Sequence, residues 1–416
     1  MPAEPQRDDI DASLSDLDTA AREPFVEKVL VACTEDWFTL SHFRPLLRRL
    51  RRISRDVVVV TRSSGRMAEI ERLGCRTVAL DYGRSSMNPL RETRTVRRLA
   101  RILGDEAPDV VHLIAMKPIV LGGLAIGLER PRHTVIHMTG LGFLAISDSL
   151  KARAARLAAL RVMRAVLRRQ ENWLLVENPE DLAFLRDGGV DAGARVTMLG
   201  GAGIDPETFA PPADLLANTV PIAAYVARMI RPKGVDVLMD AADLVSQRGI
   251  ALTIELHGDT DDDNPEAVPA KTLARWANGT DRRFMGFTKD VAAVWRHADI
   301  FVLPARSREG MPRALLEAAS CARAIVVTDV PGCRHFVRDG AEGLVVPPGD
   351  AAALADALEK LARDRDLRER LGRAARERVL SGYTEAHVEA SIEQAYRAML
   401  DRTGSFKTRS HRAGAT

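Results

Sequence analysis

Two glutamates stand eight positions apart in the segment from Arg308 to Glu317. We expect Glu309 in a loop and Glu317 inside the helix that Pro312 opens. Free N–H groups at the start of that helix favour an anion such as phosphate. Carboxylates do not bind phosphate, so their partners should be hydroxyls on either side of it. Hydroxyl-bearing groups around a diphosphate describe a sugar nucleotide, although a capped surface helix with two solvated glutamates would show the same pattern.

Alternating strand and helix patterns must position these residues. Short apolar strands are expected at 28–33, 56–61, 77–80, 110–114, 134–138, 174–177 and 196–199, and again at 222–227, 252–257, 283–285, 300–303, 324–328 and 343–346. Continuous apolar strands separated by helices indicate parallel sheets covered on both faces. The two series predict an α/β protein with two doubly wound, Rossmann-like domains whose strand ends face each other across a cleft.

The composition of the connecting segments suggests where the domains begin and end. We expect a disordered acidic tail over 1–24, domains over 25–210 and 222–385 with a linker over 211–221, a helix over 386–401 that packs back on the N-terminal domain, and a basic tail over 402–416.

Composition narrows the class of protein further. Over 416 residues the net charge is only +3, and the four cysteines show no CxxC pairing. This argues against zinc and against a disulfide framework, and it fits a reducing compartment. The first twenty residues lack the apolar core of a signal peptide, and the longest nearly apolar run, 118–128, is too short to span a bilayer. We therefore expect a cytoplasmic protein.

Several motifs in the second half occur in a specific order. They are Ala227–Gly234, Phe284–Asp290, Ala298–Pro304, Glu309–Glu317, Thr328–Cys333 and Asp339–Pro348. Looser cues in the first half are Ser41–Pro45, Val111–Leu113, Lys117-Pro118, Gly122-Gly123, His137–Gly142 and Glu177–Asp181. Over about residues 26–400 the chain resembles retaining glycosyltransferases of the large family-four group, which have the GT-B fold. Within that group it looks most like enzymes that add a sugar to an undecaprenyl-diphosphate-linked acceptor.

The resemblance implies an enzyme that moves a hexose or N-acetylhexosamine from a UDP-sugar to a lipid-linked saccharide, with retention of configuration and without a metal cofactor. Such a reaction serves surface polysaccharide biosynthesis, for example of lipopolysaccharide. The N-terminal domain would bind the acceptor and the C-terminal domain the nucleotide sugar. Two other hypotheses stay open at this point: a UDP-sugar epimerase or hydrolase on the same fold, and a catalytically inactive, membrane-associated scaffold.

The resemblance also implies roles for individual residues. The catalytic candidates are Glu309, His137, Arg228 and Lys233. The donor-binding candidates are Glu317, Gly310, Met311, Pro312, Arg313, Gly286 and Phe287. The acceptor-binding candidates are Lys117, Gly140 and Gly142. Arg228 and Lys233 follow the first strand of the second domain, where two cations can neutralise a leaving UDP without a metal. The alternative interpretations are that His137 only caps a strand and that Gly140 and Gly142 form a turn without a ligand. The chain departs from the family pattern at His335, where many relatives carry glutamate.

An acidic run after the strand at 252–257 contains an Asp-x-Asp motif, from Asp259 to Asp263. Metal-dependent sugar transferases of the other major fold bind manganese through such a motif. Acidic runs in loops are usually solvated, so we expect no metal site here.

Basic residues gather in two stretches of the first domain, 44–55 and 151–170. The second predicts a helix with an arginine face beside an arc of Ala, Val, Leu and Met. Such a helix can rest on anionic lipid headgroups, which would place the protein on the inner face of the plasma membrane. An equally weighted alternative is that the arginines of this helix simply face solvent. Neither basic stretch contains interleaved aromatic residues, so the pattern does not indicate nucleic-acid binding.

Overall fold

The computed structural model describes residues 23–83, 88–140, 150–213, 218–261, 264, 266–277, 279 and 281–402. The chain divides into two units: unit 1 runs to Ala202 and resumes at Glu385, and unit 2 runs from Gly203 to Thr384. Residues 203–210, which we assigned to the N-terminal domain from the sequence, lie in unit 2. There the Ser320 hydroxyl donates a hydrogen bond to the carbonyl oxygen of Phe209 at 2.8 Å.

Unit 1 is built on a parallel sheet with the strand order β3-β2-β1-β4-β5-β6-β7. Its strands are β1 (Val26–Glu35), β2 (Ser54–Arg62), β3 (Arg76–Ala79), β4 (Val110–Ile114), β5 (His133–Met138), β6 (Trp173–Val176) and β7 (Val196–Met198). Its helices are α2 (Asp36–His42), α3 (Arg44–Ile53), α4 (Met67–Glu71), α5 (Pro89–Glu106), α6 (Met116–Glu129), α8 (Leu150–Leu167), α9 (Pro179–Asp187) and α17 (Glu385–Arg402).

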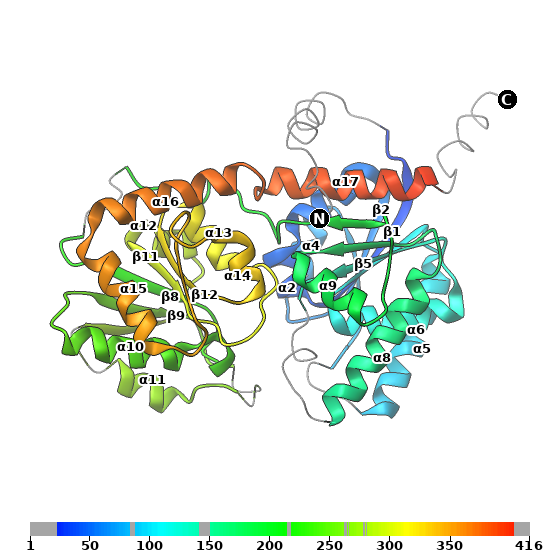
Figure 1. Ribbon diagram of the computed structural model, residues 1–416. Coiled ribbons are helices and arrows are strands. Elements are labelled where there is room, and N and C mark those ends of the chain that lie inside the picture. The colour runs from blue at the N-terminus through cyan, green and yellow to red at the C-terminus, as the bar shows by residue number, and fades with distance from the viewer. Residues whose placement is uncertain are drawn as a thin grey trace. The chain divides into compact units, whose positions relative to one another are not determined.

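The strands of unit 1 are apolar throughout because both faces of the sheet are covered. In β1, Val29 and Val31 belong to one core cluster, whereas Leu30 and Ala32 belong to another. Side chains of α2, α3 and α17 complete the first cluster, and side chains of α5, α6, α8 and α9 complete the second. Figure 1 shows α5, α6 and α8 together on one side of the sheet.

The C-terminal helix α17 packs along α3 in unit 1. Ile392, Tyr396 and Met399 of α17 are almost fully buried in the same cluster as Val29. Beside them, the buried guanidinium of Arg49 donates to the carboxylate of Glu393 at 2.8 Å. The last long helix therefore belongs to the hydrophobic core of unit 1, whose sheet is formed by strands from the first half of the chain.

Unit 2 repeats the architecture with the strand order β10-β9-β8-β11-β12-β13, again parallel. Its strands are β8 (Ile222–Val226), β9 (Thr253–His257), β10 (Arg282–Gly286), β11 (Ile300–Leu303), β12 (Ala324–Thr328) and β13 (Leu344–Val346). Its helices are the 3-10 turn η1 (Arg231–Lys233), α10 (Val235–Gln247), α11 (Ala270–Trp276), α12 (Val291–His297), α13 (Arg313–Ser320), α14 (Pro331–Phe336), α15 (Ala351–Arg363) and α16 (Arg365–Leu380).

The order of strand addition reverses once in each sheet, between β1 and β4 in unit 1 and between β8 and β11 in unit 2. Doubly wound sheets bind ligands beyond the carboxyl ends of the strands at such a point. The prediction of two doubly wound, Rossmann-like α/β domains is confirmed. In the described part of the chain, no helix combines the length and apolar character needed to cross a membrane.

Candidate functional site

The basic segment after β8 forms a tight turn that positions Lys233. This residue ends η1, and Gly234 follows it with a φ of +76°. A Cβ atom at Gly234 would lie 1.8 Å from the carbonyl oxygen of Pro304, which no side chain could tolerate. The turn therefore packs directly on the chain that leaves β11, and this close approach brings Lys233 to the loop that carries Glu309.

Lys233 and Glu309 form an ion pair in that loop. The lysine Nζ lies 2.7 Å from Oε2 of Glu309, and the two side chains are only 21% and 14% exposed. The loop itself is held by α14, because the N–H of Gly332 donates to the carbonyl oxygen of Glu309 at 3.3 Å. The backbones are so close that a Cβ at Gly332 would lie 1.4 Å from the carbonyl oxygen of Gly310. These contacts fix the backbone from which the Glu309 side chain extends.

Arg228 is paired with a carboxylate that the sequence analysis had assigned to solvent. Its Nη1 lies 2.7 Å from Oδ2 of Asp261, whose side chain is only 13% exposed. The expectation of a solvated acidic run is wrong for Asp261, because the loop after β9 folds against the basic segment: the N–H of Met229 donates to the carbonyl oxygen of Asp259. Asp262 and Asp263 lie outside the described residues. Among the residues that are described, no cluster of three or more His, Cys, Asp or Glu could hold a metal ion.

Glu317 lies in the second turn of α13 and is 7% exposed. The helix begins at Arg313, with Pro312 as its N-cap residue, one position later than the sequence suggested. Oε1 of Glu317 accepts from Nε of Arg313 at 2.8 Å, and Oε2 accepts from the indole N–H of Trp295 at 3.4 Å. Met311 is 6% exposed, and its side chain belongs to the hydrophobic core of unit 2. The carboxylate is oriented from both sides and keeps further acceptor capacity for hydroxyl groups.

The remaining donor candidates lie at the end of β10. Gly286 has a φ of +70°, and its carbonyl oxygen accepts from the N–H of Gly258 at 2.9 Å. Phe287 follows with a side chain that is 67% exposed. An exposed aromatic ring beside a strand end offers a face on which a flat base can stack.

The acceptor candidates lie in unit 1. Lys117 in α6 forms an ion pair with Glu92 of α5 at 2.9 Å and also donates to the carbonyl oxygen of Gly83, so part of its charge is already compensated. His137 is the penultimate residue of β5 and is 2% exposed, and Gly140 follows the strand with a φ of +111°. Gly142 lies outside the described residues.

Within unit 2, the structure joins the candidates in pairs: Lys233 with Glu309, and Glu317 with Arg313. It also gives roles to three residues for which the sequence predicted none. Asp261 lies in the acidic run that we expected to be solvated, and Gly332 lies in the Thr328–Cys333 motif without a predicted contact. Trp295 carries no signal in the sequence, because it approaches Glu317 from a different helix.

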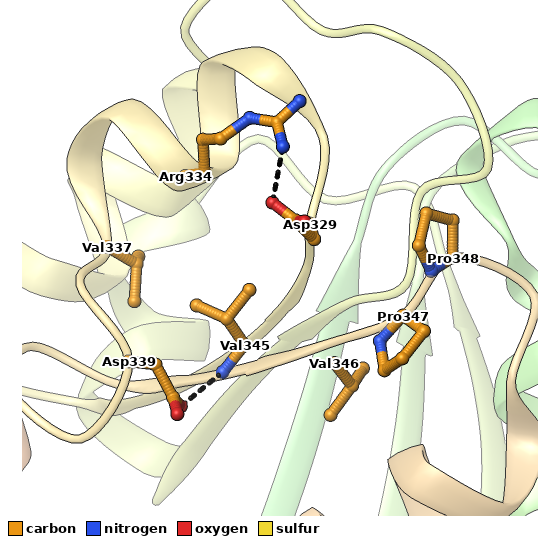
Figure 2. A pocket seen from close by; sticks show the side chains of 8 residues that line it. All are labelled: Asp329, Arg334, Val337, Asp339, Val345, Val346, Pro347 and Pro348. Atoms are coloured by element: carbon orange, nitrogen blue, oxygen red, sulfur yellow. Dashed lines mark hydrogen bonds and ion pairs between the residues drawn. The ribbon is translucent and has the colours of Figure 1, made fainter.

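A separate pocket of about 440 Å³ lies beyond the ends of β12 and β13 (Figure 2). Arg334 and Asp329 form an ion pair of 2.6 Å on one side of it, and the carboxylate of Asp339 accepts from the N–H of Val345 at 3.0 Å on the other. Neither Glu309 nor Glu317 lines this pocket, so it is distinct from the paired carboxylates described above.

Two protein families match the two halves of the chain. The family described as "Glycosyl transferase 4-like" matches residues 28–170, and the family described as "Glycosyl transferases group 1" matches residues 220–364. A similar curated protein is the N,N'-diacetylbacillosaminyl-diphospho-undecaprenol alpha-1,3-N-acetylgalactosaminyltransferase of Campylobacter jejuni. It is 24% identical over 376 residues, which cover 88% of this chain and 96% of the relative.

Solved structures share the fold at low identity. HepE of Anabaena in complex with UDP matches with a TM-score of 0.72 and 15% identity, over 89% of this chain and 100% of that one. Sucrose-phosphate synthase of Thermosynechococcus elongatus matches with a TM-score of 0.73 and 19% identity, over 90% of this chain and 100% of that one. Taken together, the family matches to both halves of the chain and the shared fold identify a glycosyltransferase of the family-four type, an enzyme with the GT-B fold.

Proposed function

We propose that this glycosyltransferase moves a hexose or N-acetylhexosamine from a UDP-sugar to a lipid-linked saccharide during surface polysaccharide or glycan biosynthesis. The Campylobacter relative is named for an acceptor built on diphospho-undecaprenol, and the Anabaena neighbour holds UDP. Both similarities extend over most of the chain, which supports the same classes of acceptor and donor here.

The observation that carries the proposal is the ion pair of Lys233 with Glu309 in unit 2. A cation beside a carboxylate suits a ligand that carries a phosphate next to a hydroxyl group, as a UDP-sugar does. In our proposal Lys233 binds the diphosphate, while Glu309 accepts hydrogen bonds from the transferred sugar. Glu317, oriented by Arg313 and Trp295, accepts hydrogen bonds from the ribose hydroxyls. Phe287 provides an exposed face for the uracil ring.

The proposed reaction retains the configuration of the anomeric carbon and takes place on one face of the sugar. The bond between C1 and the diphosphate oxygen breaks, a bond from the acceptor oxygen to C1 forms, and the acceptor proton passes to the departing diphosphate. Lys233 and Arg228 stabilise the charge that develops on the leaving group. Because two protein cations serve this purpose, we propose that transfer requires no metal ion.

The test is a transfer assay with purified enzyme, a panel of UDP- and GDP-sugars and a polyprenyl-diphosphate-linked saccharide. We expect a UDP-sugar to be consumed only with acceptor present, activity in EDTA, and an anomeric proton in the product that matches the donor configuration. Glu309→Gln should lower kcat by about a hundredfold or more, because the contact with the sugar strengthens as charge develops at C1. The matched control is Glu377→Gln, an exposed glutamate on α16.

Three results would count against the proposal. Hydrolysis of the UDP-sugar at the same rate without acceptor would favour a hydrolase. An inverted product would refute retention. An unchanged kcat in Glu309→Gln would remove that carboxylate from the reaction.

We further propose that unit 1 rests on the cytoplasmic surface of the membrane in which the acceptor is anchored. Leu124 and Leu128 stand one turn apart on α6 and are 48% and 64% exposed. On the neighbouring α8, exposed Arg153, Leu157 and Arg161 follow each other at intervals of four residues. Arginines beside exposed leucines suit an anionic interface, where the leucines reach the acyl boundary and the arginines meet headgroup phosphates.

A further inference from the structure

Three buried side chains of unit 1 form a continuous chain of hydrogen bonds. The hydroxyl of Tyr396 in α17 lies 2.9 Å from Nδ1 of His112 in β4, and Nε2 of His112 lies 3.2 Å from Nδ1 of His137 in β5. The two histidines are at most 2% exposed, and the tyrosine is fully buried. The ring of Phe43 packs edge-on against His137 with 5.4 Å between the ring centroids. The last atom of the chain, Nε2 of His137, is buried and has no hydrogen-bond partner among the described residues.

Burial keeps all three groups uncharged. It lowers the pKa of His112 well below its ordinary value, with a smaller contribution from the neighbouring His137, and it lowers the pKa of His137 to about 3. Burial also raises the pKa of the Tyr396 hydroxyl. Near neutral pH each imidazole therefore carries one ring proton, and the phenol keeps its proton.

The protons can be arranged in two directions along the chain. In the first, Tyr396 donates to Nδ1 of His112, and Nε2–H of His112 donates to Nδ1 of His137. One buried group is then left without a partner, the N–H at Nε2 of His137. In the second direction His137 donates to His112 and His112 donates to Tyr396.

The second direction leaves two groups unpaired. Nε2 of His137 becomes an acceptor without a donor, and the Tyr396 hydroxyl proton has no acceptor, because among the described residues His112 is its only partner. An unpaired buried polar group costs about 1–3 kcal/mol, so the first direction is favoured. It fixes the Nε2–H tautomer of His137.

We infer that Tyr396 and His112 are positioning residues that hold His137 as an uncharged hydrogen-bond donor, with its Nε2–H reserved for an oxygen of the sugar substrate. The substrate part of this inference rests on the proposed function. His137 lies at the carboxyl end of β5, where a doubly wound sheet meets its ligands, and the backbone continues to Gly140 in a conformation that favours glycine.

The chemical consequence is a restricted role for His137. In this tautomer Nδ1 already accepts a hydrogen bond from His112, and Nε2 already carries a proton. No lone pair of the ring is then available to remove the proton of the acceptor hydroxyl. His137 can align and polarise a sugar oxygen, but it cannot act as the base of the transfer reaction.

The test begins with the tautomer, which requires no substrate. Long-range ¹H–¹⁵N correlation spectra of the histidine-labelled enzyme, assigned with His137→Asn, should show Nε2 protonated and Nδ1 unprotonated for His137. In Tyr396→Phe, which keeps the shape of the ring, the fixed direction is lost and the His137 signals should shift towards a mixture of tautomers. In the transfer assay kcat/KM should fall by about two- to tenfold in that variant, the value of one neutral hydrogen bond.

Rescue at position 112 separates positioning from packing. The side-chain amide of His112→Gln can still donate towards Nδ1 of His137, whereas His112→Leu cannot. We expect the glutamine variant to retain the His137 tautomer and most of the activity, and the leucine variant to lose both.

Two outcomes would overturn the inference: a wild-type His137 protonated at Nδ1, or a Tyr396→Phe enzyme whose melting temperature changes while its tautomer and kcat/KM do not. If no UDP-sugar is transferred at all, the proposed function fails, but the tautomer measurement still decides the proton arrangement.

Discussion

At the scale of single residues, the two cations proposed to hold the diphosphate each have a carboxylate partner. Lys233 is paired with Glu309, and Arg228 is paired with Asp261. A diphosphate that binds Arg228 must compete with Asp261 and must also approach its negative charge. We predict that Asp261→Asn binds UDP more tightly, by up to about fivefold, because a half-exposed ion pair contributes about 0.2–1 kcal/mol. Isothermal titration calorimetry at low salt measures this change.

The matched control for this prediction is Asp356→Asn, which breaks the exposed ion pair of Arg248 with Asp356 on α15. The control removes the same charge elsewhere in unit 2 and should leave the affinity for UDP unchanged. Raising the salt concentration should reduce the gain in Asp261→Asn, because ions screen exposed charges. Weaker binding by Asp261→Asn would mean that the aspartate orients Arg228 for the phosphate and does not compete with it.

Individual residues could be predicted from the sequence where partners lie in one short segment. Glu309 and Glu317 stand on a loop and the helix that follows, so their spacing alone suggested a shared ligand. The partners of His112 could not be predicted this way, because Tyr396 comes 284 positions later and on another element. Asp261 was misjudged for a related reason, since an acidic run in a loop reads as solvated until the fold of the loop is known.

At the scale of elements, α14 and the loop before α13 are held together by backbone contact. Gly332 in the first turn of α14 touches the carbonyl groups of Glu309 and Gly310. We predict that Gly332→Ala forces the loop away and displaces the Glu309 carboxylate. A misplacement of about 1 Å can cost on the order of a hundredfold in rate, so kcat for transfer should fall by about that factor. Transfer kinetics together with a circular dichroism spectrum measure the effect.

Gly382→Ala is the control for this experiment. Gly382 has open space around the position of an added Cβ, so the same substitution there should leave the transfer rate nearly unchanged. Full activity in a folded Gly332→Ala enzyme would show that the loop can shift without harm, and would weaken the assignment of a fixed position to Glu309.

The strands were the most predictable elements, because burial on both faces makes a parallel strand apolar throughout. Val57–Val60 of β2 and Ile300–Leu303 of β11 illustrate this, since each of these residues is almost fully buried. Helix ends were less predictable: Pro312 is compatible with both the N-cap and the first helical position, and the structure selects the N-cap. The close approach at Gly332 depends on how two elements pack, which no local pattern encodes.

At the scale of the whole molecule, the net charge of +3 conceals an uneven distribution. Exposed arginines and leucines share the surface of α6 and α8 in unit 1. In unit 2, by contrast, exposed Arg363 of α15 and exposed Arg365 and Arg373 of α16 are paired with carboxylates four residues away. Charge that is already paired on its own helix attracts an anionic surface less. This difference supports our proposal that a membrane surface is bound through unit 1.

We therefore predict that Arg153→Gln combined with Arg161→Gln weakens binding to vesicles that contain anionic lipid. Each arginine near such a surface contributes about 1 kcal/mol, so the pair should cost roughly thirtyfold in the partition coefficient. Arg164 on the same helix is a poor target, because its guanidinium donates to the carbonyl oxygens of Gly188 and Gly189 and its loss would disturb the end of α9.

The double variant Arg363→Gln with Arg373→Gln removes the same charge from unit 2 and should bind vesicles like the wild type. Sedimentation with vesicles of increasing phosphatidylglycerol content measures all three proteins, and the difference should shrink as salt is raised. Equal losses in both double variants would show that binding responds only to total charge. Unchanged vesicle binding by the unit 1 variant would contradict the proposed membrane surface. In that proposal the leucines reach the acyl boundary only because the arginines hold unit 1 at the headgroups.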